Sequence, residues 1–416
     1  MASKLAVEPV ALTDLAKGLQ RVDRFADVLA ALQRGESGAV DGAWGSACAL
    51  VAAALMGPCS GKLIVVLPRT GDLDEFSDDL SSFSGHPPLI FPAWESPFQE
   101  QNVSDVVWGA RLRVLKALAN PKAPKVVVTS IQALLQPVPS QRELAERTRP
   151  LRVGDELDLD AFLGWLVDHG FERVTGIERP GEFSLHGGIL DLFPPDAADP
   201  LRIEFFGDEI ESIRVFDVET QRTVQTLERA ELTLVAPPVP LSRLGDAAGR
   251  PDGDGGPPGA SGSQPAPGGH FLDSLPRGSW IILTEPFELR EEGRQYLSRL
   301  DDSRGFFSVA ATLERCTKWP TVTVAGINAD SFETACHLPI EAVDRMTGPR
   351  SEVLHELAAC VDCDERVLLA CHNEAERQRL SELLKETDPA FAERVTLCLG
   401  HVSRGFRIVA ERLVVL

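Results

Sequence analysis

The spacing of hydrophobic residues changes several times along the chain. Between residue 1 and about residue 147, amphipathic helical stretches alternate with short, continuous apolar runs. Such runs between helices are typical of buried strands in a parallel sheet. We therefore predict a parallel α/β unit here, with helices at 23–34 and 106–119 and strands at 63–67, 88–91 and 125–130.

A two-residue period replaces this pattern between about residues 148 and 238. A helix is predicted at 157–171, and strand-like runs at 183–193 and 201–206 follow it, joined by a Pro-rich loop that suits a hairpin connection. The period places Ser184 and His186 on one face of the first run, and Arg202 and Glu204 on one face of the second. We predict a small antiparallel platform that displays these polar residues above an apolar face.

Residues 245–269 are nearly all Gly, Pro, Ser, Ala and Asp, a composition that buries no apolar surface and predicts a disordered linker. Apolar runs and one helical stretch then restore the α/β pattern to the C-terminus. The predicted class is α/β with an inserted, mostly antiparallel α+β domain. The predicted divisions are 1–147 and 271–416 for the two segments of the α/β unit, 148–238 for the insertion and 239–270 for the linker.

Composition and charge narrow the function classes. The chain has 416 residues, 44% of them hydrophobic, which is enough for two or three cores. Its formal charge of −21 makes it a poor general binder of nucleic acids, because that affinity depends largely on Lys and Arg contacts to phosphates. The first twenty residues lack a signal-peptide pattern, and no apolar stretch reaches the ~18 residues that span a membrane. We predict a cytoplasmic protein with no membrane partner.

The eight cysteines are scattered, as expected of reduced thiols. Cys360 and Cys363 form a CxxC pair, and Cys371 and His372 follow nearby. Zinc would need four such ligands arranged as a tetrahedron. Because Cys371 ends an apolar strand-like run and Cys360 ends a helical stretch, we favour buried thiols over a metal site and predict no metal or cofactor.

Several motifs resemble one bacterial family. The strings are GEFSLHGGILDLFP at 181–194, RIEFFGDEIESIRVFDVETQRT at 202–223, FPAWES at 91–96, VVVTSIQALLQPVP at 126–139 and GFERV at 170–174. They resemble the N-terminal module of transcription-repair coupling factors (Mfd), which is similar to the excision-repair protein UvrB. The resemblance implies that the first and third segments form one helicase-like α/β layer from which the middle segment projects.

The resemblance also identifies a degenerate nucleotide site. UvrB carries a phosphate-binding loop whose Lys reaches the terminal phosphates and whose hydroxyl holds magnesium. The equivalent residues begin at Gly42 and Gly45, with Cys48 in place of the Lys and Ala49 in place of the hydroxyl. The strand that should end in an Asp-Glu pair ends in Thr284 and Glu285. We predict no ATP hydrolysis, and we interpret 42–49 as a tight turn before a buried helix rather than a weak nucleotide site.

A second family feature is missing. UvrB grips damaged DNA with a hairpin rich in tyrosine, whereas this chain has one tyrosine, Tyr296, after the linker. Trp94, Phe98 and Trp108 lie in the corresponding region, but the segment is short and acidic. We predict that these aromatic residues pack in the core and in turns rather than stack on bases.

The resemblance implies that the middle domain docks UvrA, the damage-sensing ATPase of excision repair. Arg173, Arg202 and Glu204 match charged family positions. Ser184 and His186 replace family arginines, and His186 would carry only part of a charge near neutral pH. The alternative for each residue is an ordinary solvated surface charge, which does little.

Two functions from different classes follow. We favour a non-catalytic adaptor that recruits UvrA to stalled transcription complexes for nucleotide excision repair. The alternative is an ATP-dependent, UvrB-like protein that binds damaged DNA. Family members continue into domains that bind RNA polymerase, translocate on DNA with ATP, and mask the UvrA-docking face. Because the sequence shows none of these, we expect a fragment of a longer protein whose docking face is open.

Overall fold

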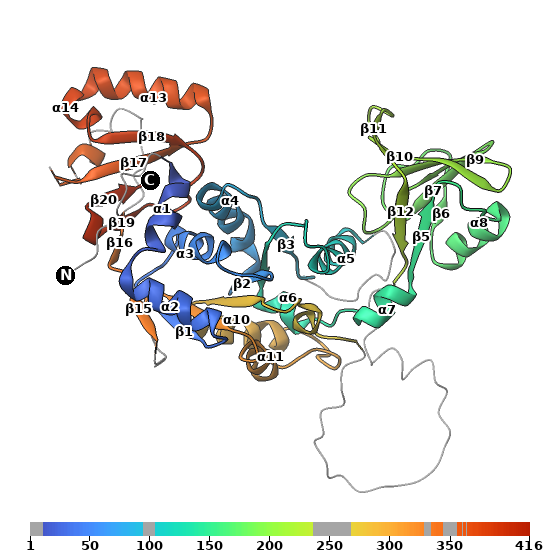
Figure 1. The fold of residues 1–416 in the computed structure, drawn as a ribbon, viewed down its shortest axis with the longest axis horizontal. Coiled ribbons are helices and arrows are strands. Elements are labelled where there is room, and N and C mark those ends of the chain that lie inside the picture. The colour runs from blue at the N-terminus through green and yellow to red at the C-terminus, as the bar shows by residue number, and fades with distance from the viewer. Residues whose placement is uncertain are drawn as a thin grey trace, which may run out of the picture.

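The computed structural model describes residues 11–94, 105–235, 268–327, 334–343, 356–359, 361–362 and 364–416. These residues form three units, each built on its own sheet. Figure 1 shows a central unit, with the inserted unit at one end and a C-terminal unit at the other.

The central unit is a seven-stranded sheet whose recorded strand pairs are all parallel. Four strands come from before the insertion: β1 (Gly38–Asp41), β2 (Leu63–Leu67), β3 (Leu89–Phe91) and β4 (Val126–Ser130). Three come from after it: β13 (Trp280–Thr284), β14 (Thr321–Ala325) and β15 (Ala335–His337). In the order β15-β1-β14-β13-β2-β4-β3, strand β13 lies between β14 and β2. The predicted α/β class with an inserted antiparallel domain is confirmed.

Helices cover both faces of this sheet. Alternate residues of β2 enter different cores, Val65 on one face and Ile64 on the other, as expected for a strand buried on both sides. The first core includes α1 (Leu12–Leu19), α2 (Asp23–Gln33), α3 (Ser46–Met56) and α4 (Leu73–Ser84). The second includes α5 (Val106–Leu118), α6 (Ile131–Leu135), α10 (Pro286–Ser298) and α11 (Val309–Cys316).

The inserted unit follows α7 (Gln141–Glu146) and contains a six-stranded sheet in the order β11-β10-β9-β8-β7-β6. Its strands are β6 (Glu172–Arg173), β7 (Glu182–His186), β8 (Ile189–Leu192), β9 (Leu201–Phe206), β10 (Glu209–Phe216) and β11 (Thr223–Leu227). The sequence predicted one strand over 183–193. The structure divides it into β7 and β8 at Gly187, whose positive φ of 62° makes the turn. The second predicted run, β9, therefore pairs with β8.

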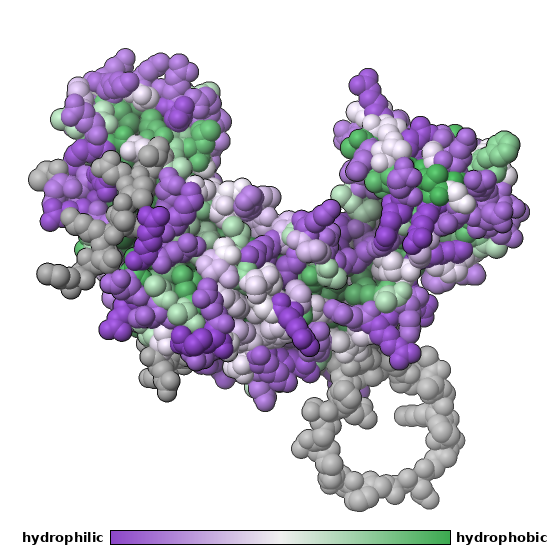
Figure 2. Space-filling model, viewed as in Figure 1, coloured by the Kyte–Doolittle hydropathy of each residue, from purple (hydrophilic) through white to green (hydrophobic). Residues whose placement is uncertain are grey.

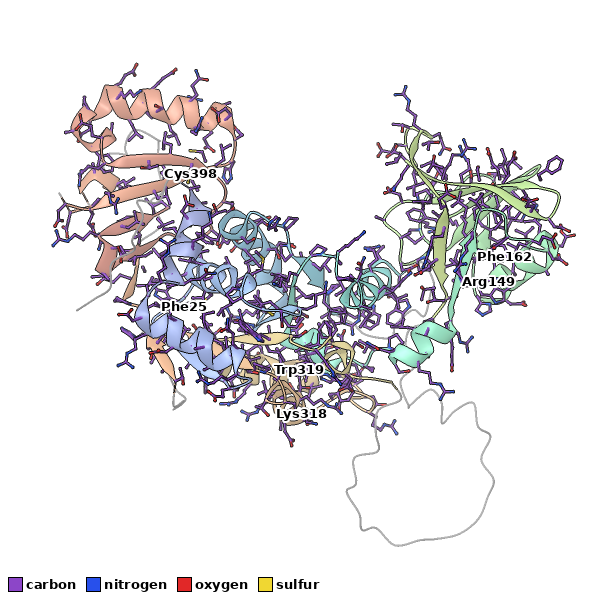
Figure 3. The ribbon with its side chains drawn as sticks, in the orientation of Figure 1. Phe25, Arg149, Phe162, Lys318, Trp319 and Cys398 are labelled. Carbon is purple, nitrogen blue, oxygen red and sulfur yellow. The ribbon has the colours of Figure 1, made fainter. Side chains whose placement is uncertain are left out.

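One helix and a short strand pair complete this unit. The helix α8 (Leu159–Asp168) buries Phe162 and Leu166 in the same core as Phe183 and Ile203 of the sheet. Strands β5 (Thr148–Arg152) and β12 (Arg229–Thr233) pair with each other as the chain enters and leaves. The Arg149 guanidinium of β5 lies 5.1 Å from the centre of the Phe162 ring, and Figure 3 shows the two side chains together.

The C-terminal unit is a five-stranded sheet in the order β16-β19-β20-β17-β18. Its strands are β16 (Ile340–Ala342), β17 (Arg366–Cys371), β18 (Val395–Leu399), β19 (Phe406–Ile408) and β20 (Leu413–Val415), and its helices are α13 (Glu374–Thr387) and α14 (Pro389–Ala392). The remaining elements are the 3-10 turns η1 (Thr70–Asp72), η2 (Phe271–Ser274) and η3 (Val409–Glu411). The hydrophobic pattern of residues 271–416 did not predict this separate sheet. Within the residues described, no helix is both long and apolar enough to cross a membrane.

Candidate functional site

The loop that follows β1 keeps the strand-loop-helix form of a phosphate-binding loop. Gly42 has a φ of 75°, and a Cβ atom there would lie 2.1 Å from the carbonyl oxygen of Leu338. Gly45 has a φ of 56°, and its Cβ would lie 3.2 Å from the Cβ of Arg404. Both positions therefore require glycine for the close approach of the C-terminal part of the chain. The Arg404 side chain packs on the loop at the entrance to α3.

The side chains of this loop offer nothing to a phosphate. Cys48 is 6% exposed, its thiol contacts the carbonyl oxygen of Ala43 at 3.4 Å, and burial raises its pKa far above the ordinary thiol value. Ala49 is fully buried in α3. The Trp44 indole N–H donates to the carbonyl oxygen of Ile340 at 3.4 Å, so this ring is attached to the C-terminal part. A buried neutral thiol supplies none of the positive charge of a lysine.

The predicted remnant of the magnesium-binding strand is also engaged elsewhere. The Thr284 hydroxyl, at the end of β13, donates to the carbonyl oxygen of Val66 at 2.9 Å. Glu285 has a φ of 45° and accepts a hydrogen bond from the Gly326 amide at 2.9 Å. Burial raises the pKa of the Glu285 carboxyl. Glu285 thus has a strained backbone, and its carboxylate is engaged by the Gly326 amide. Thr284 is buried in the sheet.

A cavity of about 280 Å³ lies where these residues meet. Its lining brings together Gly45, Cys48, Thr284 and Glu285, so the structure assembles most of the predicted degenerate site. Five acidic side chains line it, against two basic ones, Arg69 and Arg404. Arg69 is already paired with Glu292 at 2.9 Å and with Glu288 at 3.3 Å. The field in the cavity therefore repels a polyphosphate. The lining acids are Asp72, Glu75, Asp79, Glu285 and Glu288.

A group of hydrogen bonds joins the C-terminal unit to the central unit beside this cavity. The buried Asp79 carboxylate of α4 accepts bonds from the amide and the hydroxyl of Ser403, at 2.8 and 2.6 Å. His401 Nδ1 lies 3.1 Å from the same carboxylate. The Ser46 hydroxyl, at the start of α3, accepts from the Arg404 amide at 2.9 Å. We call Ser46, Asp79, His401 and Ser403 the Asp79 cluster.

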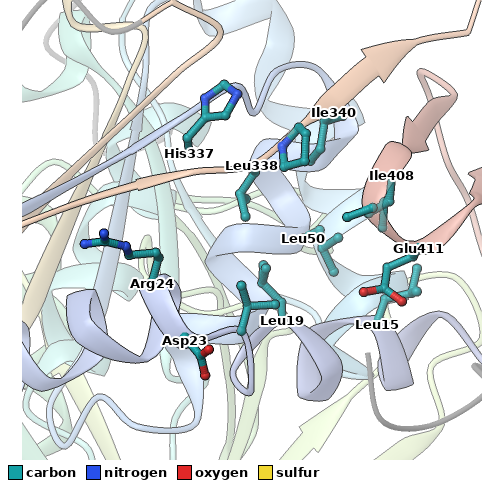
Figure 4. A pocket seen from close by; sticks show the side chains of 13 residues that line it. Leu15, Leu19, Asp23, Arg24, Leu50, His337, Leu338, Ile340, Ile408 and Glu411 are labelled. Carbon is teal, nitrogen blue, oxygen red and sulfur yellow. The ribbon is translucent and has the colours of Figure 1, made fainter. Parts of the chain in front are cut away.

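A second cavity, of about 380 Å³, lies on the other side of α3 (Figure 4). Its walls are mainly aliphatic residues of α1, α3 and the segment around β16, including Leu15, Leu50 and Ile340. Charged side chains stand at its border, among them Arg24. This cavity was not predicted from the sequence, because its lining comes from segments far apart in the chain.

The polar face of the six-stranded sheet was predicted from the two-residue period. Ser184 and His186 lie together: the Ser184 hydroxyl is 3.0 Å from His186 Nε2, and both groups contact the carbonyl oxygen of Thr175, at 3.1 and 2.9 Å. Ser184 is buried, whereas His186 is exposed. Of these two, only the imidazole is therefore accessible from solvent.

The charged residues of this face are paired with one another. Arg202 donates to both oxygens of Asp191, at 2.7 and 2.8 Å, and its guanidinium lies 4.3 Å from the centre of the Phe216 ring. The hydrogen bond to Asp191 raises the pKa of Arg202. Glu204 accepts from the Ser212 hydroxyl at 2.7 Å and forms a salt bridge with Arg214. Asp191, Ser212 and Arg214 escaped the sequence analysis, although the period of their strands carried the signal.

Arg173 occupies a different position. It lies in the edge strand β6, where the parallel register places it beside Phe183 and so away from the Ser184 side of the sheet. Its side chain is exposed and has no hydrogen-bond or ion-pair partner among the residues that the structure describes. The structure thus groups Ser184 with His186, and Arg202 with Glu204 on the same face, but places Arg173 at the rim.

The remaining candidates are core residues or lie outside the described part. Trp94 and Trp108 are buried and stacked with their ring centres 5.5 Å apart, and the Trp108 N–H donates to the Val235 carbonyl oxygen at 2.7 Å. Their predicted packing role is confirmed. Phe98, Cys360 and Cys363 lie outside the described residues. Within those described, no group of three or more metal-binding side chains occurs, and burial raises the pKa of the Cys371 thiol.

The inserted unit is similar to a known protein family. Residues 150–235 match the UvrB interaction domain family. Transcription-repair-coupling factors are similar over longer stretches: 37% identity over 190 residues in Mycobacterium tuberculosis (strain CDC 1551 / Oshkosh), 35% over 176 in Staphylococcus aureus (strain Mu50 / ATCC 700699) and 30% over 212 in Bacillus subtilis (strain 168). The matches cover 44%, 41% and 50% of this chain but only 15%, 15% and 18% of those proteins.

Proposed function

We propose that this chain is a non-catalytic adaptor that binds UvrA and recruits it to stalled transcription complexes for nucleotide excision repair, because residues 150–235 match the UvrB interaction domain family. The matched residues include the complete six-stranded sheet with its polar face. That coincidence between the matched domain and the charged face is the observation on which the proposal rests. The similar proteins are named transcription-repair-coupling factors, which supports a role in the same process.

The chemistry of the central unit supports the adaptor over an ATP-dependent enzyme. Phosphoryl transfer depends on cations that neutralise the developing charge on the phosphates. The loop at 42–49 has a buried cysteine at the lysine position, and the adjoining cavity has an excess of carboxylates. The Asp79 cluster also joins the two units beside the cavity through hydrogen bonds within the chain.

The polar face of the six-stranded sheet, with His186, Arg202 and Glu204, is suited to recognising a charged partner surface. We call it the docking face. Paired charges on a rigid sheet fix the positions of donors and acceptors, and such patterns favour specificity and rapid association more than raw affinity. Arg173 at the rim adds a guanidinium without an internal partner among the described residues. His186 presents an exposed imidazole, which lacks the forked donors of an arginine.

The wider context belongs to the same proposal. The chain spans less than a fifth of the length of the relatives, so contacts with RNA polymerase and DNA would involve parts of those proteins outside the matches. A cytoplasmic location, where the bacterial chromosome is transcribed, fits this role.

Binding of the full 416-residue chain to purified UvrA tests the proposal. Arg173→Ala and Arg202→Ala should each weaken binding, while circular dichroism shows an intact fold. Arg229→Ala is the matched control, because Arg229 is exposed on β12, outside the six-stranded sheet. The proposal is wrong if UvrA does not bind the wild-type chain, or if all three variants bind it equally well.

A further inference from the structure

Strand β18 forms one edge of the C-terminal sheet, and no strand pairs with its outer side within the described part of the chain. On its inner side, the Arg394 carbonyl oxygen accepts from the Val367 amide of β17 at 2.9 Å, and the Gly400 amide donates to the Cys371 carbonyl oxygen at 2.9 Å. Because backbone groups alternate in direction along a strand, every second residue of β18 points its amide and carbonyl to the free edge. These residues are Val395, Leu397 and Leu399.

The strand lacks the features that usually protect a sheet edge. Its five residues, Val395–Leu399, include no charged residue and no proline. Its parallel register with β17 continues from Val395 to Leu399 without a bulge. Exposed edges are commonly protected by charges, proline or bulges, because an unprotected edge accepts a further strand. The backbone of β18 is therefore suited to pairing with an extended segment.

The apolar side chains of β18 are incompletely covered. Val395 and Leu397 pack with Leu384 of α13 in the core of this unit but remain half-buried. Leu399 lies on the same side of the strand by the period of two, and it is 53% exposed. Figure 2 shows hydrophobic surface beside α13 in the C-terminal unit. A strand added to this edge would bury more of this apolar surface, which is favourable by the hydrophobic effect.

A groove of about 500 Å³ lies between this edge and α13, which contacts β18 (Figure 1). Val395 and Leu397 line the strand side of the groove. The helix side includes Glu374, Ser381 and Lys385, which lie on one stripe along α13. We call this space the β18 groove. A groove between an edge strand and a helix can hold an extended peptide, whose main chain bonds to the strand while alternate side chains enter the groove.

The charges of the β18 groove fit a segment without net charge. Two acidic side chains, Glu374 and Glu382, and two basic ones, Arg377 and Lys385, line it. Arg377 is already paired with Glu374 at 2.7 Å. The walls therefore have no excess of either sign to select a charged peptide, whereas the apolar side chains of the strand favour aliphatic residues.

We propose that the β18 groove binds an extended, uncharged peptide segment of another protein. The segment pairs with β18 as an additional strand and directs an aliphatic or β-branched side chain into the groove at every second position. A second copy of this chain fits less well, because antiparallel pairing of two β18 strands would bring both α13 helices to one face of the joined sheet, where each already borders the edge. This site lies in the C-terminal unit and does not depend on UvrA binding.

Binding of a defined peptide to the full 416-residue chain tests this inference. The probe is a fluorescein-labelled peptide in which valine and threonine alternate, and fluorescence anisotropy should show that it binds. The same peptide with every backbone amide N-methylated should not bind, because it keeps the side chains but cannot donate hydrogen bonds. A peptide with serine in place of each valine should bind more weakly, because it has no aliphatic side chain for the groove.

Two tryptophan variants locate the site on α13. Ser381→Trp places a large side chain in the groove and should weaken binding of the alternating peptide by about tenfold or more. Arg379→Trp is the matched control, because Arg379 is exposed on α13 outside the lining of the groove, and it should leave binding unchanged. Circular dichroism checks that both variants keep the fold.

Amide hydrogen exchange of the wild-type chain gives a readout that needs no substitution. When the alternating peptide binds, the amides of Leu397 and Leu399, which point to the free edge, should gain protection. The amides of Thr396 and Cys398 face β17 and should change little.

The inference is overturned if the alternating peptide does not bind the wild-type chain, or if its N-methylated form binds equally well. Equal binding by Ser381→Trp and Arg379→Trp would also overturn it, as would equal gains in protection at Thr396 and Leu397. If sedimentation shows a wild-type dimer that Ser381→Trp converts to a monomer, the occupant is a second copy of the chain and the segment of another protein is refuted. UvrA is absent from every measurement, so this inference and the proposed function fail separately.

Discussion

Ser403 donates both its backbone amide and its hydroxyl to the carboxylate of Asp79, at 2.8 and 2.6 Å, and this pair ties the C-terminal unit to α4 of the central unit. Asp79 is 2% exposed. Ser403 also lies 3.2 Å from the Ser46 hydroxyl at the start of α3. The two units are thus joined beside the cavity lined by Gly45 and Cys48, by groups of the protein itself.

Removal of this carboxylate should destabilise the chain. Asp79→Ala leaves the half-buried Ser403 donors without this acceptor, which should lower the free energy of unfolding by about 2–4 kcal/mol. Asp78→Ala, one position earlier on the exposed side of α4, is the control and should change it by no more than about 0.5 kcal/mol. Urea denaturation measures both. Equal stability of the two variants would show that the Asp79 cluster does not hold the units together.

ATP should not stabilise the chain. A ligand raises the unfolding midpoint only when it binds the folded state. Since the cavity presents five carboxylates and no free lysine in its lining, millimolar Mg-ATP should leave the thermal midpoint unchanged and no phosphate should be released. Thermal unfolding with and without Mg-ATP, together with a phosphate-release assay, checks this. A midpoint raised by several degrees, or sustained turnover, would favour the alternative ATP-dependent function.

The bidentate hydrogen bonding between Arg202 and Asp191 should be lost when lysine replaces Arg202. Lysine keeps the charge but cannot donate two parallel bonds to one carboxylate. Arg202→Lys should therefore lower the unfolding free energy by about 1 kcal/mol and weaken UvrA binding. The exposed Arg229→Lys serves as control. UvrA binding by Arg202→Lys at wild-type affinity would show that charge alone is sufficient at this position.

His270 should make the folded state sensitive to acid. Burial lowers its pKa from 6.5 to about 4, and its Nδ1 accepts from the Leu272 amide at 3.1 Å, so the folded state favours the neutral ring. The stability from this group is complete above pH 6.5 and is lost as the pH falls toward about 4. The full loss is about 3 kcal/mol, at about 1.4 kcal/mol per pH unit.

The unfolding free energy of His270→Asn should therefore depend less steeply on pH across this acid range than that of the wild type. Asparagine retains an acceptor for the Leu272 amide but does not titrate. The exposed His86→Asn should keep the wild-type slope. A His270→Asn variant with an unchanged pH profile would exclude His270 as the source.

Glu285 should give the unfolding free energy the opposite pH dependence. Burial raises its pKa above the ordinary 4.5, so the folded state favours the protonated form. Its contribution to stability is complete below pH 4.5 and is lost as the pH rises through the raised value. Glu285→Gln, which keeps an oxygen for the Gly326 amide, should therefore be more stable than the wild type at neutral pH, and the difference should shrink in acid. The exposed Glu314→Gln is the control, and an equal gain there would contradict the assignment.

Local patterns in the sequence were sufficient for much of the inserted unit. The period of two around Ser184 and Arg202 correctly separated the polar face from the core. It failed at Gly187, where a two-glycine turn divides one apparent strand into a hairpin. Hydrophobic alternation continues through such a turn, so the pattern alone could not reveal the reversal of the chain.

The chemistry of the residue types followed from the sequence alone: cysteine at the lysine position, threonine at the end of β13, and charges that alternate along β9 are properties of single positions and their neighbours. Tertiary structure decided which of those charges are already satisfied, since Arg202 meets Asp191 and Glu204 meets Arg214 only when separate strands pair. It also brought Asp79 to Ser403, more than 300 positions away, and left Leu399 exposed. Side-chain periodicity records the surroundings of a residue along its own strand or helix, whereas its partners and its exposure depend on elements that the chain brings together from elsewhere.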